Sequence, residues 1–366
     1  MQSLEHIHGG NITRASLKYG IAKNDFTDFS ANINPLGPSP KVIATLKNSL
    51  DLISSYPDPE CTELKTALAA YLGIREELLL MGNGAAELIY LLVRVTGCRT
   101  ALVPVPTFCE YSLSVLSQGG GITKIPLEGE NGFSLPVDKI ISCLPGADLL
   151  FLCNPNNPTG RLVDRVTIEH ILDQALAHKV MVLVDEAFMD FVPQRELFSM
   201  ISLVGRRPNL AVLYSMTKFF GIPGLRLGAI IAHPDLVARM SVSKDPWNVN
   251  TLAQIAGVIS LSDKAYMEKT KQLVNEEKEY LFSKLQDFPG LEPLPGAANF
   301  ILVNTSNSGY SSGELADQLG RRGIMVRDCT GFTGLAGRYL RLAVKTRPEN
   351  QTLIQALKDI LGGKDR

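Results

Sequence analysis

The chain has 366 residues, 45% of them hydrophobic, and a formal net charge of -1. This length and composition can bury a large core and suit one large domain with a smaller one beside it. Acidic and basic residues are nearly balanced and scattered, which argues against a nucleic acid or a membrane surface as partner. Any basic residue with a function must therefore act locally.

The cysteines and the N-terminal sequence indicate the cellular compartment in which the protein is expected. Six cysteines are spread along the chain without a C-x-x-C pair, which argues against a zinc site and against disulfide staples. The N-terminus has neither the basic start nor the apolar stretch of a signal peptide, and the apolar runs elsewhere are too short to span a bilayer. We therefore expect a cytoplasmic protein that holds no metal.

Residues 1–50 carry glycine and proline turns and one predicted helix, Lys41–Leu50, and we expect them to form an N-terminal arm. Residues 51–260 alternate apolar runs with amphipathic helical patterns such as Ala85–Val95 and Val166–His178. The runs are rich in Val, Leu and Ile and apolar on both faces, which predicts a large α/β domain with a mostly parallel sheet. The predicted strands are Ala101–Val105, Asp148–Cys153, Val180–Val184, Ala211–Ser215 and Leu227–Ala232.

The pattern changes near residue 260. Residues 261–366 predict a small α+β domain that packs with the N-terminal arm. Its predicted elements are the helix Lys264–Gln286, the strand Phe300–Asn304, the helix Gly313–Arg322, the strand Tyr339–Val344 and the helix Glu349–Leu361.

The first two segments with possible chemistry lie in the large domain. Met81-Gly-Asn-Gly-Ala-Ala-Glu87 opens a predicted helix, and small residues at a helix N-terminus expose backbone N–H groups to an anion. Phe108 follows a predicted strand and could stack on a flat ring. A phenylalanine that only fills the core fits the same position.

Two later segments place polar side chains where strands end. In Cys153-Asn-Pro-Asn-Asn-Pro-Thr-Gly160, prolines restrict the turn and an asparagine amide can donate a hydrogen bond to a ring oxygen. Asp185 ends a buried strand, at the edge where α/β sheets hold ligands. Because a buried carboxylate needs a cationic partner, Asp185 either pairs with a pyridinium nitrogen or caps the following loop.

Tyr214-Ser-Met-Thr-Lys218 is followed by a loop with glycine and proline and then by Arg226. A lysine at the end of a buried strand is desolvated, which lowers the pKa of its amine and makes it nucleophilic, as Schiff-base formation requires. Arg226 could bind a phosphate through two parallel hydrogen bonds. The competing interpretation is a solvated lysine after a strand.

In this order, the segments resemble the class I and II aminotransferase superfamily of fold-type I enzymes, which use pyridoxal 5'-phosphate (PLP). The resemblance covers nearly the whole chain. It implies that Lys218 and Asp185 are catalytic, with Lys218 attached to PLP and Asp185 paired with the pyridine nitrogen. Asn157 would bind the ring oxygen, and Phe108 would stack on the ring. The PLP phosphate would be held by Gly84, Ala85, Ala86, Ser215 and Arg226.

Two further positions refine this resemblance. Tyr56 resembles the tyrosine that reaches the PLP phosphate in the neighbouring subunit, which implies a homodimer with shared active sites. Many relatives place a tyrosine three residues after the aspartate, where this chain has Phe188. The ring oxygen of PLP would therefore lose one hydrogen-bond donor.

Within the superfamily, the sequence is similar to threonine-phosphate decarboxylase of cobalamin biosynthesis and to histidinol-phosphate aminotransferase. His8-Gly-Gly-Asn11, the segment Asp28–Gly37 and Phe188 favour the decarboxylase. That resemblance implies a phosphorylated amino-acid substrate, L-threonine O-3-phosphate, and aminopropanol O-2-phosphate as product. The implied substrate-binding residues are His8, Asn32, Asn157, Arg327 and Arg341, with Arg338 a weaker candidate.

Other interpretations stay open. An aminotransferase that acts on histidinol phosphate or an aromatic amino acid would need a keto-acid acceptor. A PLP-binding regulator would turn over no amino acid, and the absence of a DNA-binding module ahead of the domain argues against it. Phospho-threonine and phospho-serine differ by one methyl group, which changes binding by only ~1–3 kcal/mol, so the sequence does not separate them.

Overall fold

The computed structural model describes residues 8–362. Its largest element is a seven-stranded sheet in the order β2-β8-β7-β6-β5-β3-β4. The neighbours from β7 to β4 are parallel, and β8 runs antiparallel to both β7 and β2. The strands are β2 (Leu79–Gly82), β3 (Thr100–Val105), β4 (Gly121–Pro126), β5 (Leu149–Cys153), β6 (Met181–Asp185), β7 (Leu210–Ser215) and β8 (Gly228–Ala232).

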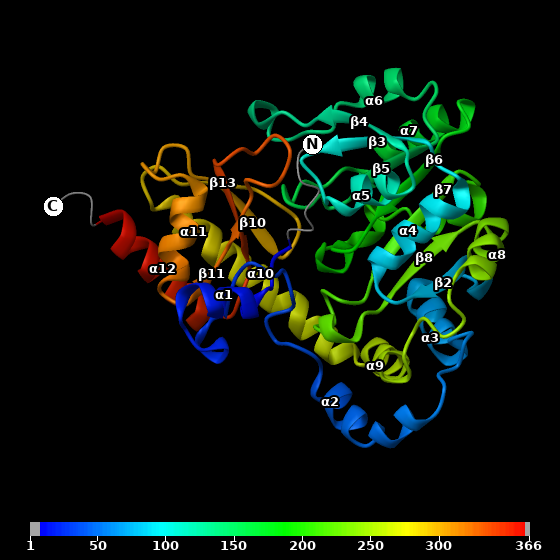
Figure 1. The fold of residues 1–366 in the computed structure, drawn as a ribbon, viewed down its shortest axis with the longest axis horizontal. Coiled ribbons are helices and arrows are strands. Elements are labelled where there is room, and N and C mark those ends of the chain that lie inside the picture. Colours follow the sequence, from blue (N-terminus) through cyan, green and yellow to red (C-terminus); the bar gives the residue numbers. More distant parts are fainter. Residues whose placement is uncertain (1–7, 363–366) are drawn as a thin grey trace.

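Helices cover both faces of this sheet (Figure 1). Since successive side chains in a strand point to opposite faces, Val182 and Leu183 belong to different cores. The core that contains Leu183 is closed by α4 (Ala85–Thr96), α5 (Glu110–Ser117) and α8 (Pro234–Ser243). The core that contains Val182 is closed by α3 (Thr62–Leu72), α6 (Val137–Cys143), α7 (Arg165–Ala177) and α9 (Thr251–Ser262).

The predicted α/β architecture with a mostly parallel sheet is confirmed, but the expectation that Leu227–Ala232 is one of the parallel strands is wrong. That segment is β8, which is antiparallel to its neighbours. A parallel return to the sheet needs a crossover connection, usually a helix, whereas only the short 3-10 helix Pro223–Leu225 separates β7 from β8. Burial on both faces gives the same apolar pattern in either direction, so the pattern could not reveal the orientation.

A second, antiparallel sheet lies beside the first and is seen at the left of Figure 1. Its strands have the order β12-β13-β10-β9. They pack with the C-terminal helices around a separate core that includes Leu281, Leu342 and Leu353. The elements are α10 (Lys264–Gln286), β9 (Glu292–Leu294), β10 (Phe300–Asn304), α11 (Ser312–Gly320), β12 (Arg327–Asp328), β13 (Tyr339–Ala343) and α12 (Arg347–Leu361).

The N-terminal residues contact both regions. The strand β1 (Thr27–Asp28) pairs in parallel with β11 (Ile324–Met325), whereas Val42 of α2 (Pro40–Lys47) joins the large core near α9. The expectation of one helix in this arm is wrong, because α1 (Ile12–Tyr19) precedes α2. This helix is short, with eight residues, and only Ala15 of it is buried. Residues 1–7 of the predicted arm lie outside the described residues, and the domain boundaries at 50 and 260 stay predictions.

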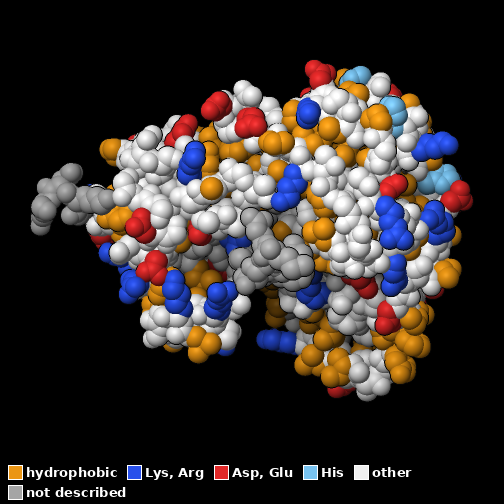
Figure 2. All heavy atoms as spheres, turned by 45° about the horizontal axis from the view of Figure 1, so that its top comes forward, with side chains coloured by type: hydrophobic (Ala, Val, Ile, Leu, Met, Phe, Trp, Pro, Cys, Tyr) orange, Lys and Arg blue, Asp and Glu red, His pale blue; other side chains and the backbone are white. Residues whose placement is uncertain are grey.

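Large hydrophobic side chains are exposed near α2. Ile53 is 69% exposed and Tyr56 is 81% exposed, and the Tyr56 ring stacks on Trp247 with 4.6 Å between ring centroids. Figure 2 shows hydrophobic side chains gathered at the lower right of the molecule, on the lobe that carries α2. Among residues 8–362, no helix combines the length and the apolarity that a bilayer crossing requires.

Candidate active site

A cavity of about 510 Å³ lies at the carboxyl ends of the central strands, between the two sheets and the N-terminal arm. Parallel strands of an α/β sheet present their ligand-binding residues at this edge. Segments far apart in the sequence therefore bring most of the predicted site residues together. Those that line the cavity are His8, Asn32, Ala85, Ala86, Phe108, Asn157, Asp185, Ser215, Lys218, Arg226, Arg327 and Arg341.

Three predicted residues do not line this cavity. Gly84 lies directly beneath Arg226, Tyr56 is exposed on the lobe of α2, and Arg338 is exposed next to β13. Phe188 does line the cavity, and its ring packs edge-on against Phe300 with 5.1 Å between centroids. This position therefore contributes an apolar wall without a hydroxyl group.

Lys218 follows β7 by three residues and faces the cavity. Burial, together with the positive charges of Arg341 and Arg226, lowers the pKa of its amine to about 8, although the Asp185 carboxylate acts in the opposite direction. An amine with this pKa is neutral in about one tenth of the molecules at pH 7, far more often than an ordinary lysine. Lys218 is therefore suited to attack an aldehyde.

Asp185 is the last residue of β6, and its carboxylate is held on both oxygens. Oδ2 accepts a hydrogen bond of 2.6 Å from the hydroxyl of Tyr111, and Oδ1 accepts one of 2.9 Å from the backbone N–H of Ala187. Burial raises the pKa of Asp185, while these two hydrogen bonds and the charge of Lys218 oppose that rise. The carboxylate is thus fixed and buried in a position where a cation would stabilise it.

Tyr111 was missed by the sequence reasoning. Its ring stacks on Phe151 of β5 with 5.0 Å between centroids, and Phe108 contacts it edge-on. Along the sequence it is one of several apolar residues of α5, and no neighbouring motif singles it out. Only the fold shows that its hydroxyl reaches the end of β6.

Gly84, α4 and Arg226 together form an anion cradle. A Cβ atom at Gly84 would lie 2.5 Å from Nη2 of Arg226, so only glycine lets the guanidinium lie across the N-terminus of α4. Arg226 itself has a φ of 57°, in the left-handed region that a side chain of this size rarely adopts. Backbone N–H groups, a helix N-terminus and a guanidinium are the combination that binds a phosphate.

Two buried polar atoms of the cavity lack a partner within the described part of the chain. They are Nε of Arg341 and Oδ1 of Asn32. The guanidinium of Arg341 otherwise donates to Oδ1 of Asn157 at 2.5 Å and to the carbonyl of Ser30 at 2.7 Å. Burial lowers the pKa of Arg341 to about 10. A buried donor without an acceptor is costly, so an anionic ligand at this position would stabilise the site.

His8 brings the N-terminal arm to the other side of the cavity. One of its ring nitrogens lies 2.9 Å from Oε1 of Glu110, and its ring lies 5.7 Å from that of Phe108. The second carboxylate oxygen of Glu110 accepts a hydrogen bond of 2.8 Å from the hydroxyl of Tyr90. Glu110 is the first residue of α5, and the sequence reasoning missed it because no motif marks this position.

Comparison with known proteins decides the family. A family model described as aminotransferase class I and II matches residues 24–357. The chain belongs to this family. The resemblance inferred from the sequence motifs is therefore confirmed.

Relatives within the class I and II aminotransferases include both a decarboxylase and an aminotransferase. The chain is 37% identical over 358 residues to threonine-phosphate decarboxylase of Salmonella typhimurium, with 97% of each chain covered. It is 34% identical over 359 residues to histidinol-phosphate aminotransferase of Moorella thermoacetica, with 97% of this chain and 90% of the other covered. The solved L-threonine-O-3-phosphate decarboxylase from Porphyromonas gingivalis matches with a TM-score of 0.80 at 26% identity, with 91% of this chain and 99% of that chain covered.

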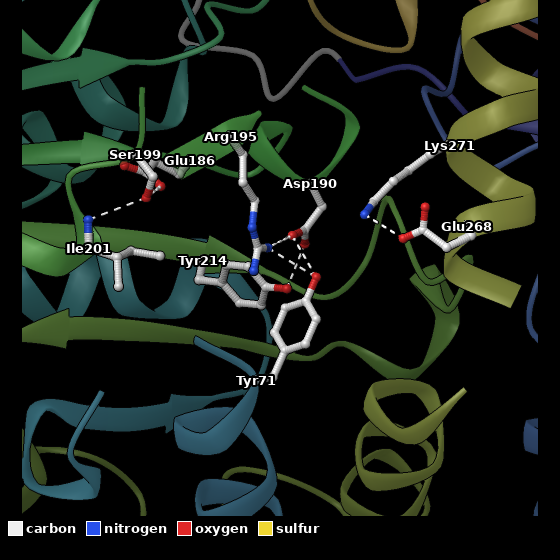
Figure 3. Close-up of polar contacts among 9 residues, drawn as sticks. All are labelled: Tyr71, Glu186, Asp190, Arg195, Ser199, Ile201, Tyr214, Glu268 and Lys271. Carbon is white, nitrogen blue, oxygen red and sulfur yellow. Dashed lines mark hydrogen bonds and ion pairs between the residues drawn. The ribbon is translucent and has the colours of Figure 1, made fainter. Parts of the chain in front are cut away.

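A second group of buried polar side chains, centred on Asp190, lies next to β7 in this member of the class I and II aminotransferase family (Figure 3). Asp190 accepts hydrogen bonds from the hydroxyls of Tyr214, at 2.5 Å, and Tyr71, at 3.0 Å, and it is also paired with Arg195. Tyr214 is the penultimate residue of β7 and precedes Lys218 by four residues, and Asp190 follows Asp185 by five residues. The network therefore joins the two segments that carry the predicted catalytic residues.

Glu186 extends this support. Its carboxylate accepts hydrogen bonds of 2.6 Å from the Ser199 hydroxyl and from the backbone N–H of Met200. Burial raises its pKa to about 7. Asp185 and Glu186 thus point to opposite sides of the same strand end, Asp185 to the cavity and Glu186 to the structural network.

Proposed function

We propose that the chain is a PLP-dependent decarboxylase that converts L-threonine O-3-phosphate to aminopropanol O-2-phosphate, a step of cobalamin biosynthesis. The observation that carries this proposal is the set of two guanidinium groups, Arg327 and Arg341, and the imidazole of His8 around one cavity that also holds Lys218. Such a set suits a small substrate with two acidic groups.

The residues of the cavity fit PLP. Lys218 supplies the amine for the covalent bond to its aldehyde, and Asp185 supplies the carboxylate for its pyridine nitrogen. The cradle of Gly84, α4 and Arg226, together with Ser215, is suited to its phosphate. When bound, PLP supplies an electron sink for the pair of electrons that a departing carboxylate leaves behind.

The substrate residues would decide which bond breaks. In a decarboxylase, these residues would have to fix the orientation of the substrate so that its carboxylate is the group that departs. Arg341, with Asn157 and Asn32 beside it, is suited to hold one acidic group, and Arg327 with His8 is suited to hold the other. Binding energy from the phosphate, which takes no part in the reaction, can set this orientation.

The direct test supplies PLP-loaded protein with O-phospho-L-threonine and no keto acid. We expect carbon dioxide and aminopropanol phosphate in equal amounts. A second sample with histidinol phosphate and 2-oxoglutarate tests the aminotransferase activity. This activity is the second candidate because the chain is 34% identical to a histidinol-phosphate aminotransferase. Glutamate formation in that sample, without carbon dioxide in the first, would replace the proposal with the aminotransferase. Neither product in either sample would contradict both functions.

We further propose that the chain acts as a homodimer. Tyr56 and Ile53 belong to the apolar surface near α2 and lie outside the cavity of their own subunit. An exposed apolar patch of this kind is typical of a protein interface. Tyr56 would then reach the PLP phosphate of the partner subunit.

We also propose a cytoplasmic location. All six cysteines lie in the described part of the chain and are free thiols. Free thiols in this number are typical of a reducing compartment. Fractionation of cells that express the chain would test this location, and recovery in the soluble cytoplasmic fraction is expected.

A further inference from the structure

We propose that Glu110 is a positioning residue that makes His8 a binding group for the substrate phosphate. This inference rests on the proposed decarboxylase function, and it assigns the substrate phosphate to the end of the cavity that His8 and Arg327 line. Glu110 itself would not contact the substrate. It would hold the imidazole ring and stabilise its positive charge, and so would give the cavity its preference for phosphorylated amino acids.

The contacts of Glu110 support this role. Its side chain is only 6% exposed and lines the cavity from the start of α5. Oε1 lies 2.9 Å from Nε2 of His8, and Oε2 accepts the 2.8 Å hydrogen bond from Tyr90 of α4. The hydroxyl of Tyr90 fixes the direction of the carboxylate. The carboxylate, in turn, holds a residue from the far N-terminus of the described chain over the cavity.

A buried carboxylate near a phosphate site is unfavourable unless a cation lies between the two anions. The imidazolium form of His8 satisfies both, because it donates one hydrogen bond from each ring nitrogen. One N–H would face Glu110 and the other a phosphate oxygen. A carboxylate that orients an imidazole and stabilises its charge is a recurrent arrangement in enzyme sites.

The remaining charged and titratable groups around this pair are consistent with anion binding. Sγ of Cys109 lies 3.7 Å from Oε1 of Glu110, and burial raises the pKa of that thiol to about 11, so it stays neutral. Arg327 lines the same cavity from β12 and is buried. In the proposed complex, a charged His8 and Arg327 would both face the substrate phosphate.

The experiment measures ligand binding to the PLP-loaded protein by the change in cofactor absorbance. O-phospho-L-threonine and L-threonine are titrated separately, and the ratio of their dissociation constants reports phosphate recognition. We expect Glu110→Gln to weaken binding of O-phospho-L-threonine about tenfold, since a charge-assisted contact is lost, and to leave L-threonine binding within about twofold. Tyr90→Phe, which leaves both cavity residues in place, is expected to weaken only the phosphorylated ligand, by about two- to threefold.

Two controls separate this role from a general loss of structure. Glu277→Gln changes another buried glutamate, which is paired with Arg347 and Asn350 away from the cavity, and it should leave both dissociation constants unchanged. In a double-mutant cycle, Glu110→Gln should add little to His8→Gln, because the two residues act through one contact.

Equal losses for O-phospho-L-threonine and L-threonine in Glu110→Gln would overturn the inference, as would an additive effect in the double mutant. So would a wild-type protein that binds the two ligands equally well. If Glu110→Gln fails to fold, Tyr90→Phe decides by the same criterion. Carbon dioxide release in the same wild-type samples tests the decarboxylase proposal by itself, so that failure of one idea is not mistaken for failure of the other.

Discussion

The hydroxyl of Tyr111 donates a hydrogen bond of 2.6 Å to Oδ2 of Asp185, and both residues line the cavity that Lys218 also lines. This bond opposes the rise in the pKa of Asp185 that burial causes. It therefore helps to keep the carboxyl group ionised, as pairing with a pyridinium nitrogen requires. The tyrosine acts on the cofactor site through the aspartate.

We expect Tyr111→Phe to weaken PLP binding about tenfold or more, because a hydrogen bond to a charged group contributes about 1.5–3 kcal/mol. Titration of the cofactor-free protein with PLP measures the effect. Tyr71→Phe is the matched control, since Tyr71 also donates to a buried aspartate, Asp190, but does not line the cavity. An unchanged affinity in Tyr111→Phe would show that the hydrogen bond has no role in cofactor binding.

Lys218 should destabilise the cofactor-free protein at neutral pH. Its pKa falls from 10.5 to about 8 on folding, so the folded state binds the proton less tightly than the unfolded state. The cost of burying the charge is complete below pH 8, declines between about pH 8 and 10.5, and vanishes above that range. This fall in the pKa of Lys218 corresponds to a cost of about 3–4 kcal/mol.

Lys218→Met should therefore raise the free energy of unfolding of the cofactor-free protein at pH 7, and the gain should shrink towards pH 10.5. Denaturant unfolding at a series of pH values measures this. Lys278→Met serves as a comparison, because burial also lowers the pKa of Lys278, which lies outside the cavity. A gain that does not depend on pH would mean that packing, and not charge, limits stability at residue 218.

Much of this site could be predicted from the sequence because its residues occur in short motifs at strand ends. Asp185 ends a buried strand, Lys218 and Asn157 follow buried strands, and the parallel topology gathers them at one edge of the sheet. Tyr111 and Glu110 were missed because their partners are 74 and 102 residues away in the sequence. Contacts of that range depend on tertiary packing, which no local pattern encodes.

The same distinction holds for the fold. The amphipathic and apolar patterns predict α10 and β10 with the bounds that the structure shows. The antiparallel direction of β8 was not predicted, because it depends on the connection that precedes the strand. The strand β4 was missed because only one of its six residues is buried. An edge strand has no continuous apolar pattern to detect.

Arg341→Ala should reduce kcat/KM for O-phospho-L-threonine by far more than tenfold. The guanidinium lies buried between Asn157 and Ser30 and makes contacts that a charged substrate group would complete. Arg341→Lys should not restore activity, because an ammonium group lacks the planar fork of donors. Arg338→Ala is the control and should have little effect, since Arg338 is exposed and does not line the cavity. Equal losses in the two alanine variants would argue against a substrate contact.

Shared active sites predict complementation between two inactive or weakly active variants. In a mixed dimer, a Lys218→Ala subunit provides its intact Tyr56 to the site of a Tyr56→Ala subunit, whose own Lys218 is intact. We expect the mixture, after subunit exchange, to show higher activity than either variant alone. Activity that never exceeds the weighted average of the two variants would contradict a site built from two subunits.

The most direct test of the central claim, that Lys218 bonds covalently to PLP, is reduction of the PLP-loaded protein with borohydride followed by peptide mass spectrometry. We predict one cofactor adduct per chain, on the peptide that contains Lys218, and no adduct in Lys218→Ala. An adduct on another lysine, or a protein that remains colourless and unmodified with excess PLP, would contradict the assignment.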